Sequence, residues 1–202
     1  MKYFITAIDT NVGKTVISAI IVKALDAAYW KPIQCGDLEY SDTMKVENLV
    51  KNVQTFQEAH ALEFPLSPHE SARLSGVDID LNDFNLPSKG NLIIEGAGGL
   101  MVPLNENGDL VIDIARKIDA EIIVVIKNYL GSINHSLLTI DYLKRNNFKI
   151  KGLVVNGDVT SSSERVIEKN SGCKILFRIP FSKEINSDFV KEQALVARKA
   201  LT

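Results

Sequence analysis

The ten residues TAIDTNVGKT, from Thr6 to Thr15, constrain the fold of this chain more than any other stretch. They overlap the end of an apolar run, Lys2–Ile8, and lead into Lys14–Ala27, where apolar residues recur with helical spacing. A strand, a tight glycine-containing turn and a helix in this order are typical of a phosphate-binding loop, whose pattern is G-x-x-x-x-G-K-S/T. Ala7 stands where that pattern has its first glycine, and we expect its methyl group to lie at the strand exit, away from the phosphates.

The loop carries the groups that bind phosphate. Gly13 allows backbone N–H groups to turn toward phosphate oxygens, and a helix that begins near Lys14 directs its positive end at the same anion. We expect the Lys14 ammonium to reach the β- and γ-phosphates and the Thr15 hydroxyl to ligate Mg²⁺. The loop residues expected to bind the nucleotide are Asn11, Val12, Gly13, Lys14, Thr15 and Val16. The alternative is a chance V-G-K-T, which the strand–loop–helix context disfavours.

Short apolar runs alternate with amphipathic stretches along the rest of the chain. The runs that predict buried strands are Leu92–Glu95, Glu121–Ile126, Lys151–Asn156 and Lys174–Ile179, with a weaker candidate at Tyr29–Ile33, where Pro32 must end or edge the strand. Helical spacing recurs at Leu110–Ile118 and Ile133–Leu143. This alternation predicts a single-domain P-loop α/β fold over residues 1–202, with a mostly parallel central sheet and helices on both faces. The irregular residues 52–90 are interpreted as an excursion within that domain.

Composition and charge disfavour several classes of protein. With 202 residues, 46% of them hydrophobic, the chain suffices for one compact domain with a sizeable core. A formal net charge of −2 argues against a large basic face for nucleic acid. No secretion signal is evident, and no apolar run reaches the ~18 residues that a membrane span needs. Cys35 and Cys173 lie far apart, which favours free thiols, and we expect a cytoplasmic protein without nucleic-acid or membrane partners.

Ligands of such sheets bind beyond the carboxyl ends of the strands, where several acidic residues fall. Glu95 ends an apolar run before the flexible segment GAGG, a place where a carboxylate can meet Mg²⁺. Asp42 is a second candidate, although Ser41 and Asp42 before a helical run are equally an N-cap signature, and both roles can hold. Thr15, Asp42 and Glu95 would together form an all-oxygen Mg²⁺ site.

Five segments resemble, in the same order, motifs of the dethiobiotin synthetase family. They are the opening T-x-x-D-T-x-V-G-K-T, WKPIQCG (Trp30–Gly36), IEGAGG (Ile94–Gly99), LGSINHSLLT (Leu130–Thr139) and VVNGD (Val154–Asp158), and they extend over nearly the whole chain. The resemblance implies an ATP-dependent carbon–nitrogen cyclo-ligase of biotin biosynthesis that works as a homodimer. It would close the ureido ring of dethiobiotin from 7,8-diaminononanoate, CO₂ and Mg-ATP, through a carbamate and a carbamic-phosphoric anhydride, and release ADP and phosphate.

The resemblance also implies roles for individual residues. Lys31 and Lys14 are the implied catalytic cations, although a lone lysine at a strand end is more often a surface residue. The further nucleotide-binding residues are Asp42, Glu95, Gly96, Ala97, Gly98, Asn156, Gly157, Pro180, Phe181 and Ser182. The residues implied to contact the diamine substrate are Thr10, Lys31, Cys35, Pro68, Gly98, Gly131, Ser132 and Asn134.

Two of these assignments, those of Asn156 and Cys35, have simpler alternatives. Asn156 would read the adenine edge because an amide both donates and accepts, but an N-G pair is also a common turn. The helix opening G-S-I-N-H would bind the substrate carboxylate of the neighbouring subunit through its N–H groups, and His135 within it is interpreted as structural. Cys35 stands where the family generally has a hydroxyl, and a thiol is a poorer donor, so it is equally a small buried filler.

Three other functions remain as alternatives. A glutamine-dependent ligase of the same superfamily would need a further domain, for which we expect 202 residues to leave no room. A MinD- or ParA-type switch ATPase would carry a signature lysine where this chain has Asp9. A non-enzymatic nucleotide-binding remnant is supported by Ala7 and Cys35 but disfavoured by the retained lysines and carboxylates. Asn11 stands where an acidic residue is frequent in the family.

Overall fold

The computed structural model describes residues 1–87 and 90–202, and its central element is a seven-stranded sheet with the order β4-β2-β6-β1-β7-β8-β9. Each pair of neighbouring strands in it runs parallel. The strands are β1 (Lys2–Ala7), β2 (Ala28–Trp30), β4 (Thr55–Phe56), β6 (Leu92–Glu95), β7 (Glu121–Lys127), β8 (Ile150–Asn156) and β9 (Ile175–Ile179). All carboxyl ends therefore lie along one edge of the sheet.

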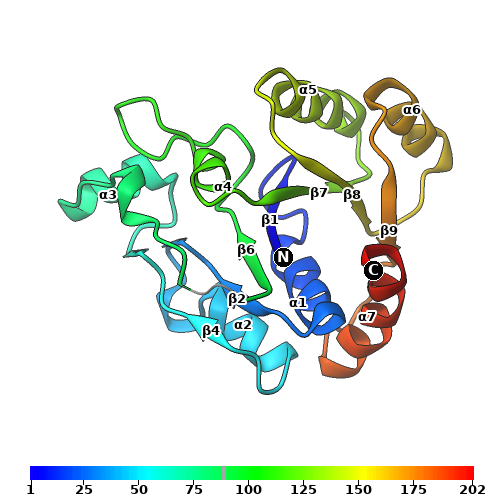
Figure 1. The fold of residues 1–202 in the computed structure, drawn as a ribbon, viewed down its shortest axis with the longest axis horizontal. Coiled ribbons are helices and arrows are strands. Elements are labelled where there is room, and N and C mark those ends of the chain that lie inside the picture. The colour runs from blue at the N-terminus through cyan, green and yellow to red at the C-terminus, as the bar shows by residue number, and fades with distance from the viewer. Residues whose placement is uncertain (88–89) are drawn as a thin grey trace.

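Helices cover both faces of this sheet, so the predicted α/β architecture is confirmed (Figure 1). One face carries α1 (Lys14–Leu25), α2 (Asp42–Leu49) and α7 (Ser187–Leu201). The other carries α4 (Asp113–Lys117), α5 (Ser132–Arg145) and α6 (Ser161–Ser171). Beside the main sheet lie β3 (Ile33–Cys35), β5 (His60–Leu62), α3 (Pro68–Ser75) and two short 3₁₀ helices, η1 (Leu38–Tyr40) and η2 (Leu81–Asp83).

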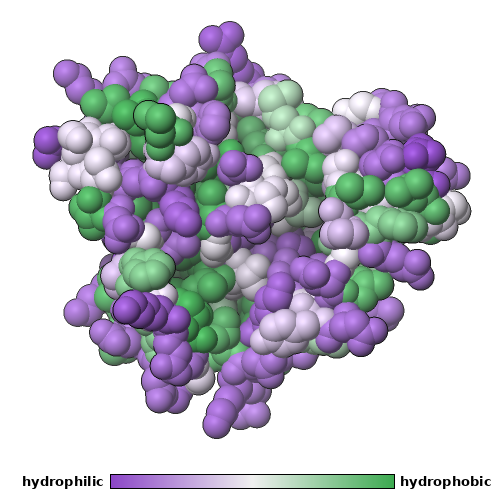
Figure 2. All heavy atoms as spheres, turned by 180° about the vertical axis from the view of Figure 1, so that it is seen from behind, coloured by the Kyte–Doolittle hydropathy of each residue, from purple (hydrophilic) through white to green (hydrophobic). Residues whose placement is uncertain are grey.

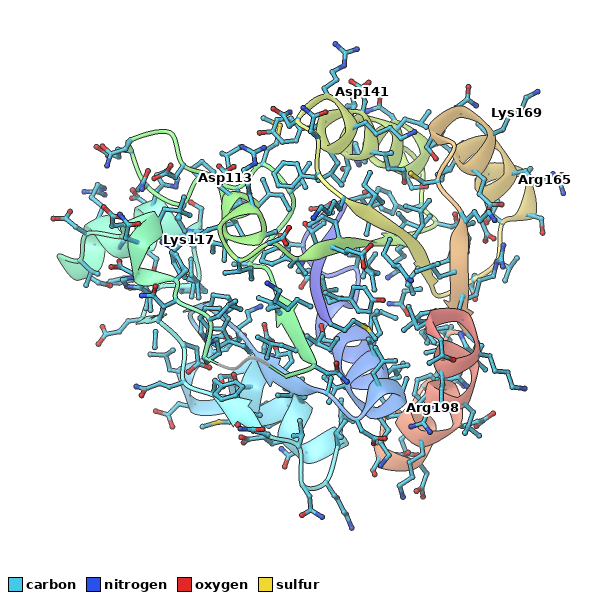
Figure 3. All side chains as sticks on the ribbon, in the orientation of Figure 1. Asp113, Lys117, Asp141, Arg165, Lys169 and Arg198 are labelled. Carbon is cyan, nitrogen blue, oxygen red and sulfur yellow. The ribbon has the colours of Figure 1, made fainter. Side chains whose placement is uncertain are left out.

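Two apolar layers join the sheet to its helices. Along β1, Phe4 packs into one layer, whereas Tyr3 and Ile5 pack into the other, because successive strand residues point to opposite faces. Burial on both faces explains why the strands read as nearly continuous apolar runs. Charged side chains such as Asp141 of α5 and Arg165 of α6 point away from the sheet (Figure 3). From behind, hydrophilic and apolar side chains alternate over the surface (Figure 2).

The segment Tyr29–Ile33, predicted as one strand, contributes instead to two sheets. β2 ends before Pro32 and pairs with β6, whereas β3 begins at Ile33 and pairs with β5. Proline has no backbone N–H to donate to a neighbouring strand. The break between β2 and β3 therefore falls at Pro32, where the sequence predicted the end or the edge of a strand. Lys31 is consequently placed at the carboxyl end of β2.

Other elements also differ from the expectations. The helix predicted over Leu110–Ile118 is helical only at Asp113–Lys117, where the Asp113 carboxylate accepts a hydrogen bond from the Leu110 N–H at 2.9 Å. Within residues 52–90, interpreted as an excursion, β4 joins the edge of the main sheet, and residues 88 and 89 lie outside the described part. Helices α6 and α7 were not predicted. In the described part of the chain, no helix has the length and hydropathy that crossing a bilayer requires.

Candidate active site

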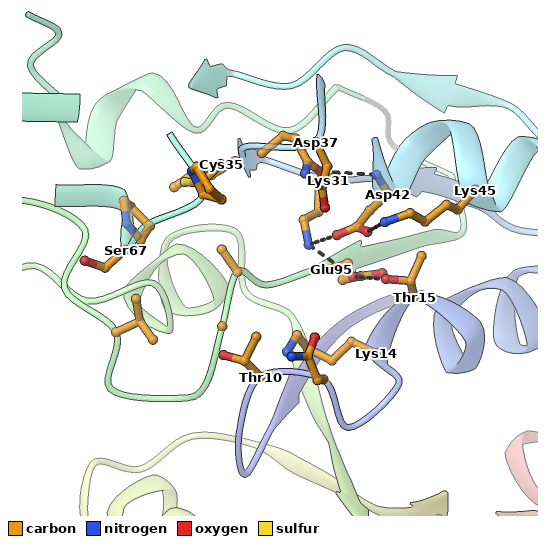
Figure 4. Close-up of a pocket in the computed structure, with 18 of the residues that line it drawn as sticks. Thr10, Lys14, Thr15, Lys31, Cys35, Asp37, Asp42, Lys45, Ser67 and Glu95 are labelled. Carbon is orange, nitrogen blue, oxygen red and sulfur yellow. Dashed lines mark hydrogen bonds and ion pairs between the residues drawn. The ribbon is translucent and has the colours of Figure 1, made fainter. Parts of the chain in front are cut away.

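A cavity of about 710 Å³ lies at the carboxyl edge of the sheet, among the loop after β1, the start of α2 and the loop before α3 (Figure 4). The predicted residues that line it are Thr10, Asn11, Gly13, Lys14, Thr15, Val16, Lys31, Cys35, Asp42, Pro68, Glu95, Ala97 and Gly98. The structure thus brings residues predicted to bind phosphate, metal and substrate, which come from separate segments, into one cavity. Ala7 is buried in the core beneath α1 and does not line the cavity.

The phosphate loop has a backbone shape that two of its residues make possible. Asn11 and Gly13 both have left-handed backbone conformations, with φ angles of 59° and 94°. Glycine and asparagine adopt this conformation most readily, which gives a physical reason for Asn11 in the loop. A Cβ atom at Gly13 would also lie 2.1 Å from Asn156 Nδ2. The second glycine of the motif is therefore favoured here by conformation, and a side chain in its place would also have to displace the Asn156 amide.

Lys14 begins α1 with its side chain largely buried against the cavity. Its ammonium donates a hydrogen bond to the Asp9 carbonyl at 3.3 Å. Burial lowers the pKa of Lys14 to about 8, and the negative charge of Glu95 opposes that shift only in part. A phosphate bound at this point would supply counter-charge that the folded protein provides incompletely.

Lys31 lies at the centre of a buried charged cluster. Its ammonium is 2.7 Å from Asp42 Oδ2 and 3.1 Å from Glu95 Oε1, and it donates to the Gly96 carbonyl at 3.4 Å (Figure 4). The Lys31 side chain is only 5% exposed. Burial alone would lower the pKa of Lys31, but Glu95 and Asp42 together raise it, so the ammonium stays charged.

Asp42 has two roles that the sequence left open, and the geometry allows both. It is the first residue of α2, and the hydroxyl of Ser41 caps that helix by accepting a hydrogen bond from the Met44 N–H at 3.3 Å. The Asp42 carboxylate points instead into the cavity, between Lys31 and Lys45. Burial opposes its ionisation, but these two ammonium groups lower the pKa of Asp42 to about 2.

Glu95 is 1% exposed, and both of its oxygens have partners. Oε1 accepts a hydrogen bond from the Thr15 hydroxyl at 2.9 Å and contacts Lys31, whereas Oε2 accepts from the Tyr29 hydroxyl at 3.0 Å. Burial and the negative charge of Glu95 hold the pKa of Tyr29 well above its usual value, so this hydroxyl is a donor.

Asp42 and Glu95 both contact the Lys31 ammonium, and the Thr15 hydroxyl bonds to Glu95, so the three side chains offer oxygen atoms in one region; their chemistry fits Mg²⁺, which prefers oxygen ligands. Among residues 1–87 and 90–202, no group of three or more His, Cys, Asp or Glu side chains is placed to hold a metal. A cation here would therefore draw on the Thr15 hydroxyl, phosphate oxygens and water besides the two carboxylates.

The same cavity contains several of the residues predicted to face the diamine, and one of them, Thr10, belongs to the phosphate loop itself. Thr10, Cys35, Pro68 and Gly98 all line the cavity. Burial raises the pKa of the Cys35 thiol to about 11, although the charge of Lys31 opposes the shift. The thiol is therefore protonated at neutral pH, and it offers the cavity a weak hydrogen-bond donor.

The predicted adenine-side residues do not line this cavity, and one of them, Asn156, contacts the phosphate loop. Asn156 ends β8, and its Nδ2 donates a hydrogen bond to the Val12 carbonyl at 2.8 Å. The other members of the group, at the ends of β8 and β9, are Gly157, Pro180, Phe181 and Ser182. Pairing of β8 with β9 brings the two loops together, and the Phe181 side chain is 69% exposed there.

A second hollow, of about 460 Å³, lies beside the first and shares Thr10 and Val102 with it. It is bordered by His135 and Leu138 of α5. The residues predicted to bind the substrate carboxylate across a dimer, at the start of α5 and outside the main cavity, are Gly131, Ser132 and Asn134. His135 Nδ1 lies 2.8 Å from the Tyr129 hydroxyl, a contact that fits a structural role.

Comparisons with known proteins identify the family. The family described as "AAA domain" matches residues 1–188. The ATP-dependent dethiobiotin synthetase BioD of Cytophaga hutchinsonii is 48% identical over 198 residues, which cover 96% of this chain and 95% of that protein. The protein of the same name from Christiangramia forsetii is 45% identical and covers 99% of this chain and 97% of its own length. The chain belongs to the dethiobiotin synthetase family.

Solved structures show how widely this family's fold is shared. The chain resembles a ParA family ATPase from Chlorobium tepidum, with a TM-score of 0.57, 17% identity and coverage of 99% of this chain and 91% of that one. It also resembles the septum site-determining protein MinD of Pyrococcus horikoshii, solved with Mg-ADP, with a TM-score of 0.59, 14% identity and coverage of 100% and 93%. At such identities the likeness shows the fold alone.

Sequence reasoning missed three polar residues of the candidate site in this member of the dethiobiotin synthetase family. Gln34 accepts a hydrogen bond from the Asp42 N–H at 3.2 Å and donates to the Gly36 carbonyl at 2.9 Å. Lys45 contacts Asp42 at 3.1 Å, and its spacing of three residues on a predicted helical run was an available signal. Tyr29 gave no such signal, because its partner Glu95 is 66 residues away in the sequence.

Proposed function

We propose that this chain closes the ureido ring of dethiobiotin from 7,8-diaminononanoate, CO₂ and ATP. The observation that carries the proposal is the buried Lys31 ammonium, held between Asp42 and Glu95 in the cavity that also contains the phosphate loop. The name of both relatives, ATP-dependent dethiobiotin synthetase, agrees with this reaction. A nucleotide-binding remnant would have no chemical need for this ammonium.

The reaction consists of three bond-forming steps. One substrate amine attacks CO₂ and loses a proton, which gives a carbamate. A carbamate oxygen then attacks the γ-phosphorus, ADP leaves, and a carbamic-phosphoric anhydride results. The second amine attacks the carbonyl carbon and loses a proton, and phosphate departs with the carbamate oxygen as the ring closes. Negative charge develops on oxygen in these steps, so fixed cations in a dry site accelerate them.

The two buried lysines supply those cations. In the proposed mechanism, the Lys31 ammonium exchanges a carboxylate partner for carbamate and γ-phosphoryl oxygens, and the Lys14 ammonium binds the β- and γ-phosphates. Both side chains are less than a tenth exposed, which strengthens their interaction with anions. Mg²⁺ held by Thr15, Asp42 and Glu95 would supply further neutralisation of the phosphate charge.

The base of ATP would bind beside Asn156. Oδ1 of this amide would accept a hydrogen bond from the 6-amino group of adenine, while Nδ2 continues to donate to the Val12 carbonyl. Phe181 is exposed nearby on the loop after β9 and offers an apolar surface to the base.

We also propose a homodimer in which the start of α5 serves the neighbouring subunit. Leu130, just before this helix, is fully exposed, and Leu138, within the helix, is 60% exposed; a partner would cover both. The N–H groups at the start of this 14-residue helix would then bind the substrate carboxylate, with Asn134 alongside. Use of ATP and the presence of two free cysteines support a cytoplasmic location.

The proposed reaction is tested by incubating the protein with ATP, Mg²⁺, bicarbonate and the diamine, and by measuring product mass and released phosphate. We expect one dethiobiotin for each phosphate, and neither when any component is omitted. Phosphate release that ignores the diamine would refute ring closure. The dimer is tested separately by sedimentation and by Asn134→Ala, which should raise KM for the diamine but not for ATP. A strictly monomeric, fully active protein would contradict the shared carboxylate site.

A further inference from the structure

A buried tyrosine contacts the proposed metal site from inside the protein core. Tyr29 lies on β2, is 0% exposed, and donates its hydroxyl hydrogen to Glu95 Oε2 at 3.0 Å. Parallel pairing aligns Tyr29 with Ile93 of β6, and the alternation of side chains places Ile93 and Glu95 on the same face of the sheet. The tyrosine hydroxyl therefore approaches Glu95 along the face that α1 covers.

The hydrogen bonds divide the two carboxylate oxygens of Glu95 between the core and the cavity. Oε2 is occupied by Tyr29, which reaches it from the buried side. Oε1 faces Thr15 and Lys31, two residues that line the cavity. A rotation of the carboxylate would break the Tyr29 bond and leave a buried oxygen without that donor, which costs free energy.

We propose that Tyr29 is a positioning residue that fixes Glu95 so that only Oε1 is offered to the metal–nucleotide complex. The inference rests on the metal role of Glu95 in the proposed function. Residues that orient a metal-binding carboxylate commonly change metal affinity by about 10- to 100-fold when they are removed. The alternative is that Glu95 merely satisfies a buried hydroxyl, in which case Tyr29 matters for folding and not for the metal.

The chain contains a matched control. Tyr3 on β1 also pairs with Ile93, from the opposite side of β6, and belongs to the same apolar layer with 2% exposure. The Lys151 ammonium lies 5.8 Å from the centre of the Tyr3 ring. In the described part of the chain, the Tyr3 hydroxyl makes no hydrogen bond to a residue that lines the cavity. Tyr29→Phe and Tyr3→Phe thus remove the same atom from comparable depths, but only the first removes a bond to Glu95.

The test measures Mn²⁺ binding to the protein–ADP complex by electron paramagnetic resonance, without the diamine. We expect Tyr29→Phe to weaken Mn²⁺ binding by about tenfold or more and Tyr3→Phe to change it by less than about twofold. In a Glu95→Gln background, Tyr29→Phe should add no further loss, because the positioned carboxylate is gone. Circular dichroism before each titration sets the concentration of folded protein.

Equal Mn²⁺ affinities for Tyr29→Phe and the wild type would overturn the positioning role, whatever happens to stability. An equal loss in Tyr29→Phe and Tyr3→Phe would also overturn it, because the effect would then belong to the core. Since the measurement contains neither CO₂ nor the diamine, its outcome is independent of the ring-closure assay. If the protein failed to close the ring but Tyr29→Phe still weakened Mn²⁺ binding, the proposed reaction would be refuted and the positioning role of Tyr29 would be supported.

Discussion

Two polar clusters, each built around a buried carboxylate, lie at the carboxyl edge of the same sheet, and they differ in what their charges can reach. The first, here called the open cluster, consists of Lys31, Asp42 and Glu95 and lines the main cavity. The second, the closed cluster, consists of the buried Glu164 of α6, Asn128 directly after β7 and the partly exposed Arg178 of β9, and none of the three lines either hollow.

In the closed cluster the protein itself saturates the acid. Glu164 is 2% exposed and accepts hydrogen bonds from Arg178 Nε at 2.6 Å, Asn128 Nδ2 at 3.1 Å and the Thr160 N–H at 3.2 Å. In the open cluster one ammonium is shared by two acids at the wall of a cavity. The comparison teaches that burial of charge alone does not mark an active site: the charges must also be able to exchange protein partners for ligand.

The largest expected effect is on catalysis by the open cluster. Lys31→Ala should retain ATP binding but lose turnover by about 100- to 1,000-fold, because a fixed cation near the transferred phosphoryl group is removed. Steady-state turnover and nucleotide titration measure the two quantities. Turnover equal to that of the wild type would remove Lys31 from its assigned role.

The closed cluster should respond in the opposite way. Glu164→Gln should lower the free energy of unfolding by about 1–3 kcal/mol, because a charged acceptor of several hydrogen bonds is lost. For a chain of this length each kcal/mol lowers Tm by about 2–4 °C, and turnover per folded molecule should persist. Glu192→Gln, on the exposed side of α7, is the matched control and should leave Tm unchanged. A Glu164→Gln variant that is stable but inactive would break the comparison.

The stability supplied by Glu164 should depend on pH. Burial would raise its pKa, but the bonds from Arg178, the Thr160 N–H and Asn128 lower it below the usual 4.5. The carboxylate therefore contributes fully above pH 4.5 and loses that contribution as pH falls through the lowered pKa. Denaturant unfolding should show a constant difference in the free energy of unfolding between the wild type and Glu164→Gln from neutral pH down to pH 4.5. The difference should become smaller at lower pH. If the difference in the free energy of unfolding grew on acidification, the pKa of Glu164 would not be lowered in the folded protein.

The smallest effect concerns the thiol beside the open cluster. With a pKa of about 11, Cys35 should react with iodoacetamide about tenfold faster for each pH unit between 8 and 10, because the thiolate is the reacting form. Peptide mass spectrometry separates its alkylation from that of Cys173. A rate that levels off near pH 8.5 would show an ordinary, solvated thiol at this position.

Much of the fold could be predicted because its signals are local. The phosphate loop, the apolar strands and the acid that ends Leu92–Glu95 each depend on a few neighbouring residues. Their placement on one edge follows from parallel pairing, so most predicted phosphate, metal and substrate residues meet in one cavity.

What escaped prediction depends on pairing between distant segments. The Tyr29–Glu95 bond requires the register of β2 against β6, and the Asn156–Val12 bond joins residues 144 positions apart. The residues adjacent in sequence to Tyr29, or to Asn156, do not indicate either hydrogen bond. The division of Tyr29–Ile33 between two sheets likewise depends on β5, because β3 pairs with β5 and not with a strand of the main sheet.

The central claim, that a carbamate oxygen attacks ATP in this cavity, has a direct isotopic test. The protein is mixed with ATP, Mg²⁺, the diamine and freshly dissolved C¹⁸O₂ in unlabelled water and quenched before the label exchanges, and the released phosphate is analysed by mass spectrometry. We predict one ¹⁸O atom in each phosphate, because the carbamate oxygen leaves with phosphorus when the ring closes. Unlabelled phosphate released with dethiobiotin would contradict the account.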